Sequence, residues 1–122
     1  MLQQETIFQK IINKEVPAKI IYEDSKTIAF LDIKPISKGH FLVVPKNFSR
    51  NLISIDDEDL INLMMVANKL AKKFMKENKA SGYQLHVNNE SDARQVVFHT
   101  HVHIIFSYPN ELLSDQEHHF NG

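Results

Sequence analysis

A long amphipathic stripe near the middle of the chain constrains the fold more than any other feature of the sequence. From about Asp56 to Glu77, apolar residues recur at intervals of three and four, which predicts a long helix with one buried face. Ser54 and Asp57 mark its start, and lysines gather at its end, as the helix dipole favours. The apolar positions are Leu60, Leu63, Met64, Ala67, Leu70, Ala71 and Phe74. A helix of this kind needs an apolar surface to cover.

Short segments rich in β-branched and aromatic residues supply that surface as predicted strands. They are Lys19–Tyr22, Thr27–Ile33, His40–Pro45, Tyr83–Asn88 and Val96–Phe106. A shorter helix is predicted from about Thr6 to Lys14, because Thr6 and Gln9 form a capping-box pattern and Pro17 stops the segment. Asn89–Arg94 is predicted to be a polar loop. Short connections favour antiparallel pairing, so the predicted fold class is α+β, with an antiparallel sheet and its helices on one face.

Charge and composition exclude several classes of partner and site. The sequence has 14 Lys and Arg residues against 15 Asp and Glu residues, so no field of one sign attracts nucleic acid or a membrane. It has no cysteine, which excludes disulfides and cysteine-ligated zinc. No apolar run is long enough to span a bilayer, and Met1–Glu5 lacks the features of a signal peptide, so the expected location is the cytoplasm.

The segment from Phe98 to Phe106 is the most informative for function. Side chains alternate between the faces of a strand, so His99, His101 and His103 are predicted to share one face, about 7 Å apart in succession. The opposite face is predicted to pack inward, under the long helix. It is formed by Phe98, Thr100, Val102, Ile104 and Phe106. Three imidazoles therefore come together on the less buried face, where an ordinary solvated strand would carry Thr, Lys or Glu.

Clustered imidazoles suit phosphoryl or nucleotidyl transfer. A neutral imidazole is a competent nucleophile near pH 7, its neighbours can bond phosphate oxygens, and crowding lowers the pKa of each ring. His101 is the predicted nucleophile because it has a partner on each side. The alternative is a metal site, since two histidines at alternate strand positions can ligate zinc and His40 is a candidate further ligand. The predicted strand contains no carboxylate, so phosphate chemistry is the favoured interpretation.

These residues resemble the motif of the histidine triad family. His-x-His-x-His precedes apolar residues here, and Gln95 stands four residues before His99, as in the nucleoside phosphoramidase branch. Further blocks of similarity lie upstream, in the same order and spacing. They are residues 6–12, 15–24, 29–35, 39–46, 83–88 and 91–92. The resemblance covers about residues 6–106, so residues 1–122 are predicted to form a single domain with a C-terminal tail, residues 107–122.

The resemblance implies a fold and a reaction. The fold is a five-stranded antiparallel sheet with two helices, in a homodimer whose sheets join. The reaction is attack on the α-phosphorus of a purine nucleoside phosphoramidate or acyl-nucleotide, followed by hydrolysis of a nucleotidyl-histidine. The expected mechanism uses no cofactor and no metal, and neither nucleic acid nor membrane is an expected partner. Two alternatives stay open: a dinucleoside polyphosphate hydrolase, and a nucleotide-binding interaction module with weak catalysis.

The resemblance also implies the roles of the histidines. His101 is the nucleophile, and His99 orients it. His103 binds phosphate oxygens or the leaving group, and His40 forms a hydrogen bond to the triad without contacting the substrate. His86, His118 and His119 belong to no motif and are assigned no role.

The implied nucleotide-binding residues lie mostly upstream of the triad. Asp32 would accept the ribose hydroxyls, while Asn88 and Gln95 would bind phosphate oxygens or the leaving group. The apolar slot for the base would be formed by Ile7, Phe8, Ile11, Phe30 and Ile33.

Five residues depart from the family pattern. Val96 stands where a serine is common, and valine cannot protonate a leaving group. Asn89 and Glu90 stand where the pattern usually has Glu and Gly, Arg94 replaces a glycine, and Thr100 occupies a position that is usually apolar. The source of the leaving-group proton and the shape of this loop are therefore left open by the sequence.

Overall fold

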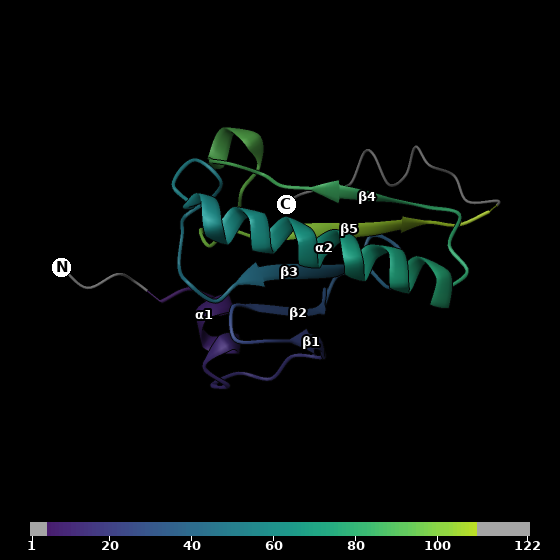
Figure 1. Cartoon of the computed structure of the whole chain (residues 1–122), viewed down its shortest axis with the longest axis horizontal. Helices are drawn as coiled ribbons and strands as arrows, with labels where there is room; N and C mark the ends of the chain where they lie inside the picture. The colour runs from purple at the N-terminus through teal and green to yellow at the C-terminus, as the bar shows by residue number, and fades with distance from the viewer. Residues whose placement is uncertain (1–4, 110–122) are drawn as a thin grey trace.

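The computed structural model describes residues 5–109, and it contains one antiparallel sheet with two α-helices (Figure 1). The elements are α1 (Ile7–Ile12), β1 (Ile20–Glu23), β2 (Thr27–Leu31), β3 (Phe41–Pro45), α2 (Asp57–Glu77), β4 (Gly82–His86), the 3₁₀ turn η1 (Ser91–Ala93) and β5 (Val102–Ser107). The five strands follow the order β1-β2-β3-β5-β4, and every neighbouring pair is antiparallel. The predicted fold class is confirmed. Most of the predicted tail, with His118 and His119, lies outside the described residues.

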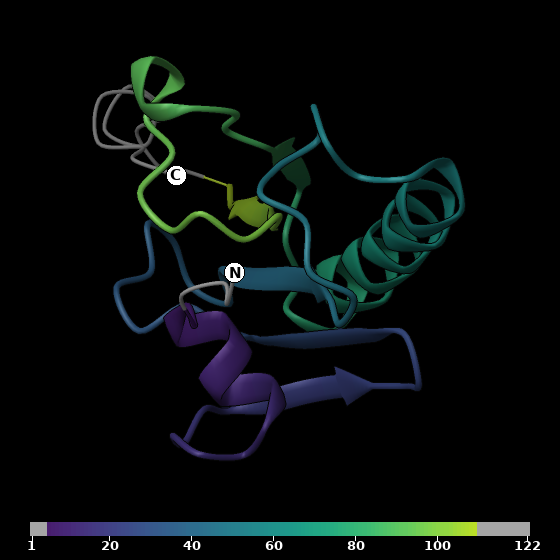
Figure 2. The ribbon, with the colours of Figure 1, turned by 90° about the vertical axis from the view of Figure 1, so that its left-hand side faces the viewer.

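The two helices lie on opposite faces of the sheet (Figure 2), so the prediction of helices on one face is wrong. The helix α2 packs on one face of the sheet, where Phe41 and Val43 contribute to its core. On the other face, Phe8 and Ile11 of α1 pack with apolar residues of β2 and β3, among them Leu42. The physical reason is that β3 is apolar at every position and buried throughout, as a strand covered on both sides must be.

Both α-helices begin at capped residues. The Thr6 hydroxyl accepts from the Gln9 N–H at 3.1 Å, as the capping-box pattern predicts, whereas the Gln9 amide contacts Asn13 instead of returning to Thr6. The cap of α2 is Asp56, whose carboxylate accepts from the N–H of Asp59. The predicted start signal at Ser54 is wrong, because that hydroxyl bonds a main-chain carbonyl three residues earlier. Within residues 5–109, no helix combines the length and apolar character needed to cross a membrane.

The predicted strand from Val96 to Phe106 is wrong in its first half, because β5 begins only at Val102. Residues 94–101 leave the sheet and run beside the segment that follows β3, where the Thr100 N–H donates to the Ser49 carbonyl at 2.8 Å. The apolar half behaves as predicted, since Val102, Ile104 and Phe106 are fully buried under α2. Side-chain alternation therefore does not place His99 and His101.

A buried pair of hydroxyls explains the unusual Thr100. Its hydroxyl donates to the Ser49 carbonyl at 3.1 Å and lies 2.6 Å from the Ser49 hydroxyl, which must then be the donor of that second bond. Both residues are buried. The pair fastens the segment that carries His99 and His101 to the loop after β3.

This pair predicts non-additive effects on stability. Thr100→Val leaves a buried Ser49 hydroxyl without its acceptor and should cost about 1–3 kcal/mol, while the double variant with Ser49→Ala should cost less than the sum of the two single changes. Urea unfolding of the two single variants and the double variant measures the coupling. Strictly additive free energies of unfolding would show that the two hydroxyls do not interact.

Candidate active site

A cavity of about 630 Å³ opens on the α1 side of the sheet. Most of the predicted site residues line it, and they are Ile7, Phe8, Ile11, Phe30, Asp32, Ile33, His40, His101 and His103. Nine further lining residues were not predicted as site residues, and they are Val16, Pro17, Ala18, Leu31, Lys34, Ile36, Leu42, Val96 and Val97. His99, Asn88 and Gln95 are not among the lining residues. The structure thus brings the predicted base slot, the ribose acceptor and three of the four histidines to one cavity.

The main chain fixes the proton on the His101 ring. The Nδ1 atom of His101 lies 2.7 Å from the main-chain oxygen of His99. A carbonyl oxygen only accepts hydrogen bonds, so Nδ1 carries the proton and the lone pair of the neutral ring is on Nε2. The ring is 3% exposed, and its centroid is 4.9 Å from that of Phe8 and 5.0 Å from that of His103. His101 is therefore held in the tautomer that a nucleophile needs.

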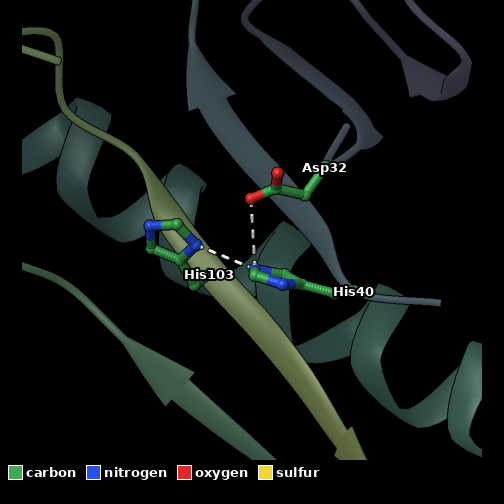
Figure 3. A group of neighbouring side chains, drawn as sticks. All are labelled: Asp32, His40 and His103. Atoms are coloured by element: carbon green, nitrogen blue, oxygen red, sulfur yellow. Dashed lines mark hydrogen bonds and ion pairs between the residues drawn. The ribbon is translucent and has the colours of Figure 1, made fainter. Parts of the chain in front are cut away.

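His40 and His103 form a hydrogen-bonded pair with Asp32 beside it (Figure 3). The main-chain N–H of Ile36 donates to His40 Nδ1 at 3.1 Å, so the neutral His40 ring carries its proton on Nε2. That proton is donated to His103 Nδ1 at 2.9 Å. A neutral His103 then carries its own proton on Nε2, which suits it to bond an anionic oxygen.

The same three side chains are the candidate metal ligands among the described residues. Single atoms of Asp32, His40 and His103 lie within 4.8 Å of one another, and the Asp32 carboxylate is 3.5 Å from His40 Nε2. If a metal ion bound His40 Nε2, the proton of the His40 ring would have to move to Nδ1, and the Ile36 N–H already points at that atom. Two donors would then face each other. The arrangement therefore favours a hydrogen-bond chain over the metal site that the sequence left as an alternative.

The ring of His99 lies behind the cavity wall. Its Nε2 atom is 2.9 Å from the Pro45 carbonyl oxygen, its Nδ1 is 3.3 Å from the Thr6 hydroxyl, and the ring of Phe48 packs edge-on at 5.2 Å. All three predicted triad rings are buried, so their expected position on the less buried face is wrong. The contact from His99 to His101 runs through the main-chain oxygen of His99.

Burial lowers the pKa of two of these histidines. Desolvation depresses the pKa of His40, although the nearby Asp32 carboxylate opposes the shift, and it depresses the pKa of His99, where a hydrogen bond to the Pro45 carbonyl opposes it. Both rings therefore keep the neutral form to more acidic pH than a free histidine does. Neutral rings are what the hydrogen-bond pattern above requires.

These depressed pKa values predict that stability falls with acidification. The unfolded chain binds protons as the pH falls through the ordinary value of 6.5, before the folded His40 and His99 can do so. The free energy of unfolding should drop by up to about 1.4 kcal/mol per pH unit for each residue between its unfolded and folded pKa. Thermal melts of the wild type and His40→Asn from pH 7.5 to 5 test this. A wild-type Tm that does not change over this range would contradict it.

Gln95 and Asn88 hold the loop that leads to the histidines. The Gln95 amide oxygen accepts from the Asn51 amide and the Glu90 N–H, and its nitrogen donates to the carbonyls of Arg50 and Val97. The Asn88 amide nitrogen donates to the Ala93 carbonyl at 2.7 Å. Contact of either side chain with a nucleotide stays a prediction.

The two glycine replacements lie where the backbone favours glycine. Glu90 has φ of +80° and Arg94 has φ of +70°, in the region that side chains other than glycine seldom adopt. The Glu90 carboxylate bonds the Arg50 guanidinium at 2.9 and 3.0 Å, and it accepts from Asn51 at 2.6 Å. Arg50 holds the pKa of Glu90 at about 2. No local sequence pattern pointed to this contact, because Arg50 is 40 residues away.

Comparison with known proteins agrees with this geometry. The model of the HIT domain family matches residues 13–110. The chain belongs to the HIT domain family. This HIT-domain chain is 58% identical over 105 residues to a HIT-like protein of Mesomycoplasma hyorhinis. The aligned residues cover 86% of this chain and 95% of the relative.

Solved structures of HIT proteins share the fold. A HIT-like protein involved in cell-cycle regulation from Bartonella henselae has a TM-score of 0.87 at 38% identity, covering 92% of this chain and 86% of that one. A histidine triad nucleotide-binding protein from Candida albicans has a TM-score of 0.78 at 38% identity, covering 85% and 76% of the two chains. The family suggested by the sequence motif is confirmed.

Proposed function

We propose that this HIT-domain protein hydrolyses purine nucleoside phosphoramidates or acyl-nucleotides at the α-phosphorus. The observation that carries the proposal is the bond from His101 Nδ1 to the His99 carbonyl, which leaves the lone pair of a cavity-lining imidazole on Nε2. The similarity to the nucleotide-binding Candida albicans protein supports a nucleotide as the ligand.

The reaction has two displacements at phosphorus. His101 Nε2 attacks the α-phosphorus, the bond to the leaving nitrogen or oxygen breaks, and the leaving group takes the electron pair and a proton. The ring becomes positively charged, and its Nδ1–H bond to the His99 carbonyl is then charge-assisted. Water attacks the phosphorus in the second step and loses a proton to solvent, the phosphorus–nitrogen bond breaks, and neutral His101 is restored as the nucleoside monophosphate leaves.

The neighbouring groups stabilise charge on the phosphoryl oxygens. The His40 N–H is committed to His103 Nδ1, so the Nε2–H of His103 is the donor that serves an oxygen of the substrate. Val96 lines the cavity and has no acidic proton to donate, so in the proposed reaction the leaving group takes its proton from solvent.

The apolar slot suits a purine with little choice between adenine and guanine. Phe8 and Phe30 are almost fully buried and pack edge-to-face at 5.5 Å, while Ile33 lies exposed at the rim. These side chains offer contact area and no hydrogen bonds to the base. Apolar contact of this kind discriminates by about 1–3 kcal/mol, which favours purines for their size.

A substrate panel on the purified protein tests the function. AMP- and GMP-linked amides should be hydrolysed to the monophosphates with similar kcat/KM, and EDTA should leave the rates unchanged. Faster turnover of diadenosine polyphosphates would favour the neighbouring hydrolase activity. Nucleotide binding without turnover of any of these compounds would favour the interaction module instead.

We also propose that the protein is a homodimer. Among residues 5–109, β4 is an edge strand of the sheet, and the neighbouring helix α2 exposes Ile61 and Met65. Unprotected edges and exposed apolar side chains favour association. Light scattering at micromolar concentration should give twice the mass of one chain, and a monomer mass would contradict the proposal.

A further inference from the structure

The hydroxyl of Thr6 joins the first turn of α1 to the histidine segment. Its oxygen accepts from the Gln9 N–H at 3.1 Å, which caps α1, and lies 3.3 Å from His99 Nδ1. In the sequence, His99 is 93 residues from Thr6, whereas Gln9 is only three residues from it. The capping-box pattern in the sequence predicts the contact with Gln9, whereas only the fold shows the contact with His99.

The direction of the second bond follows from the other nitrogen of the ring. His99 Nε2 is 2.9 Å from the Pro45 carbonyl oxygen, so Nε2 carries the proton and Nδ1 has the lone pair. The single hydroxyl proton of Thr6 is therefore donated to His99 Nδ1. Accepting from Gln9 and donating to His99 use different parts of the hydroxyl, so both contacts form together.

Side-chain contacts matter here because no sheet pairing holds this segment. His99 precedes the start of β5 at Val102, and its ring is fixed by Pro45, by Thr6 and by packing against Phe8. The main-chain oxygen of His99 in turn accepts from the His101 ring. A change in the His99 ring therefore reaches the atom that orients the nucleophile.

We propose that Thr6 is a positioning residue for His101 and that it acts through His99. The proposal rests on the function proposed above. The helix that Thr6 caps carries Phe8, whose ring packs against both His99 and His101 and lines the base slot. Thr6 thus ties one wall of the nucleotide cavity to the orientation of the nucleophile, and misplacing a reacting group by about 1 Å can cost about 10²-fold in rate.

Three substitutions separate this role from helix capping. Thr6→Ser keeps both hydrogen bonds, Thr6→Asp keeps the cap but has no proton for His99, and Thr6→Val loses both. We expect Thr6→Asp to melt close to the wild type while kcat falls about tenfold or more and KM changes about twofold or less. Thr6→Ser should restore kcat, and Thr6→Val should lose both Tm and kcat. Gln9→Ala is the matched control on α1, since it keeps the main-chain donor, and it should leave kcat unchanged.

Nitrogen NMR of the His99 ring gives a readout that does not depend on turnover. In the wild type at neutral pH the ring should carry its proton on Nε2 alone, and in Thr6→Asp the added carboxylate should raise the pKa of His99 toward the doubly protonated ring. Wild-type kcat in Thr6→Asp would overturn the proposal, as would equal losses of kcat in Thr6→Asp and Thr6→Ser. If the protonation of the His99 ring changes in Thr6→Asp as expected but the protein hydrolyses no substrate, the proposed function fails while the Thr6–His99 contact stands.

Discussion

Replacing His101 by alanine should lower kcat by at least about 10²–10⁴-fold while nucleotide binding persists. The change removes the nucleophilic Nε2 and leaves the ribose acceptor and most of the apolar slot in place. Single-turnover hydrolysis of an AMP amide measures the chemical step, and calorimetric titration with AMP measures binding. His99→Ala and His103→Ala should each cost less, because these residues orient the nucleophile or bind phosphate oxygens.

Retained binding is the control that makes the loss of rate interpretable. If His101→Ala loses AMP affinity in proportion to its activity, the cavity has collapsed and His101→Asn, which keeps a polar side chain of smaller volume, becomes the test. A His101 variant that keeps more than about a tenth of the wild-type kcat would contradict nucleophilic catalysis, because the expected loss is at least about 10².

Asp32 should make the protein discriminate ribonucleotides from 2′-deoxyribonucleotides. Its carboxylate lines the cavity, and one oxygen already accepts from the Lys34 N–H at 2.8 Å. A hydrogen bond from a ribose hydroxyl to a charged acceptor contributes about 1.5–3 kcal/mol, so kcat/KM should fall about 10–150-fold for the 2′-deoxy substrate. Comparing the two substrates on the wild type measures this ratio.

The substitution Asp32→Ser isolates the contact with the sugar. A serine hydroxyl at this position can still accept from the Lys34 N–H and preserve the turn, but it is too short to serve the ribose. The ratio between ribo and 2′-deoxy substrates should approach one in this variant. Equal turnover of the two substrates by the wild type would remove Asp32 from the nucleotide site.

Much of the architecture could be predicted because periodic patterns set it. The stripe that ends near Glu77 forms α2, and four of the five apolar segments form strands within two residues of their predicted bounds, whereas β5 begins six residues later than predicted. The arrangement of the helices was predicted wrongly, although the continuous apolar run from Phe41 to Val44 is typical of a strand that is buried on both faces. A strand that is apolar on both faces favours one helix on each face of the sheet, as the structure has them.

The histidine segment shows where sequence patterns stop being sufficient. The alternation of His99, His101 and His103 predicted one strand, but hydrogen bonds of Thr100 to Ser49 take the first two histidines out of the sheet. The atoms that fix the protons of the rings are main-chain groups at Ile36, Pro45 and His99. Every residue has a main-chain carbonyl, and every residue except proline has a main-chain N–H, so no particular residue type marks these positions in advance.

In the proposed reaction, His101 becomes covalently bound to the nucleotide. The most direct measurement is rapid mixing with an AMP amide labelled in the adenosine, followed by quenching in alkaline denaturant and mass analysis of the peptides. A nucleoside monophosphate should form on the peptide that contains His101 within one turnover, and it should be absent from His101→Ala. Turnover with no such adduct at any time, or activity that EDTA abolishes and zinc restores, would contradict it.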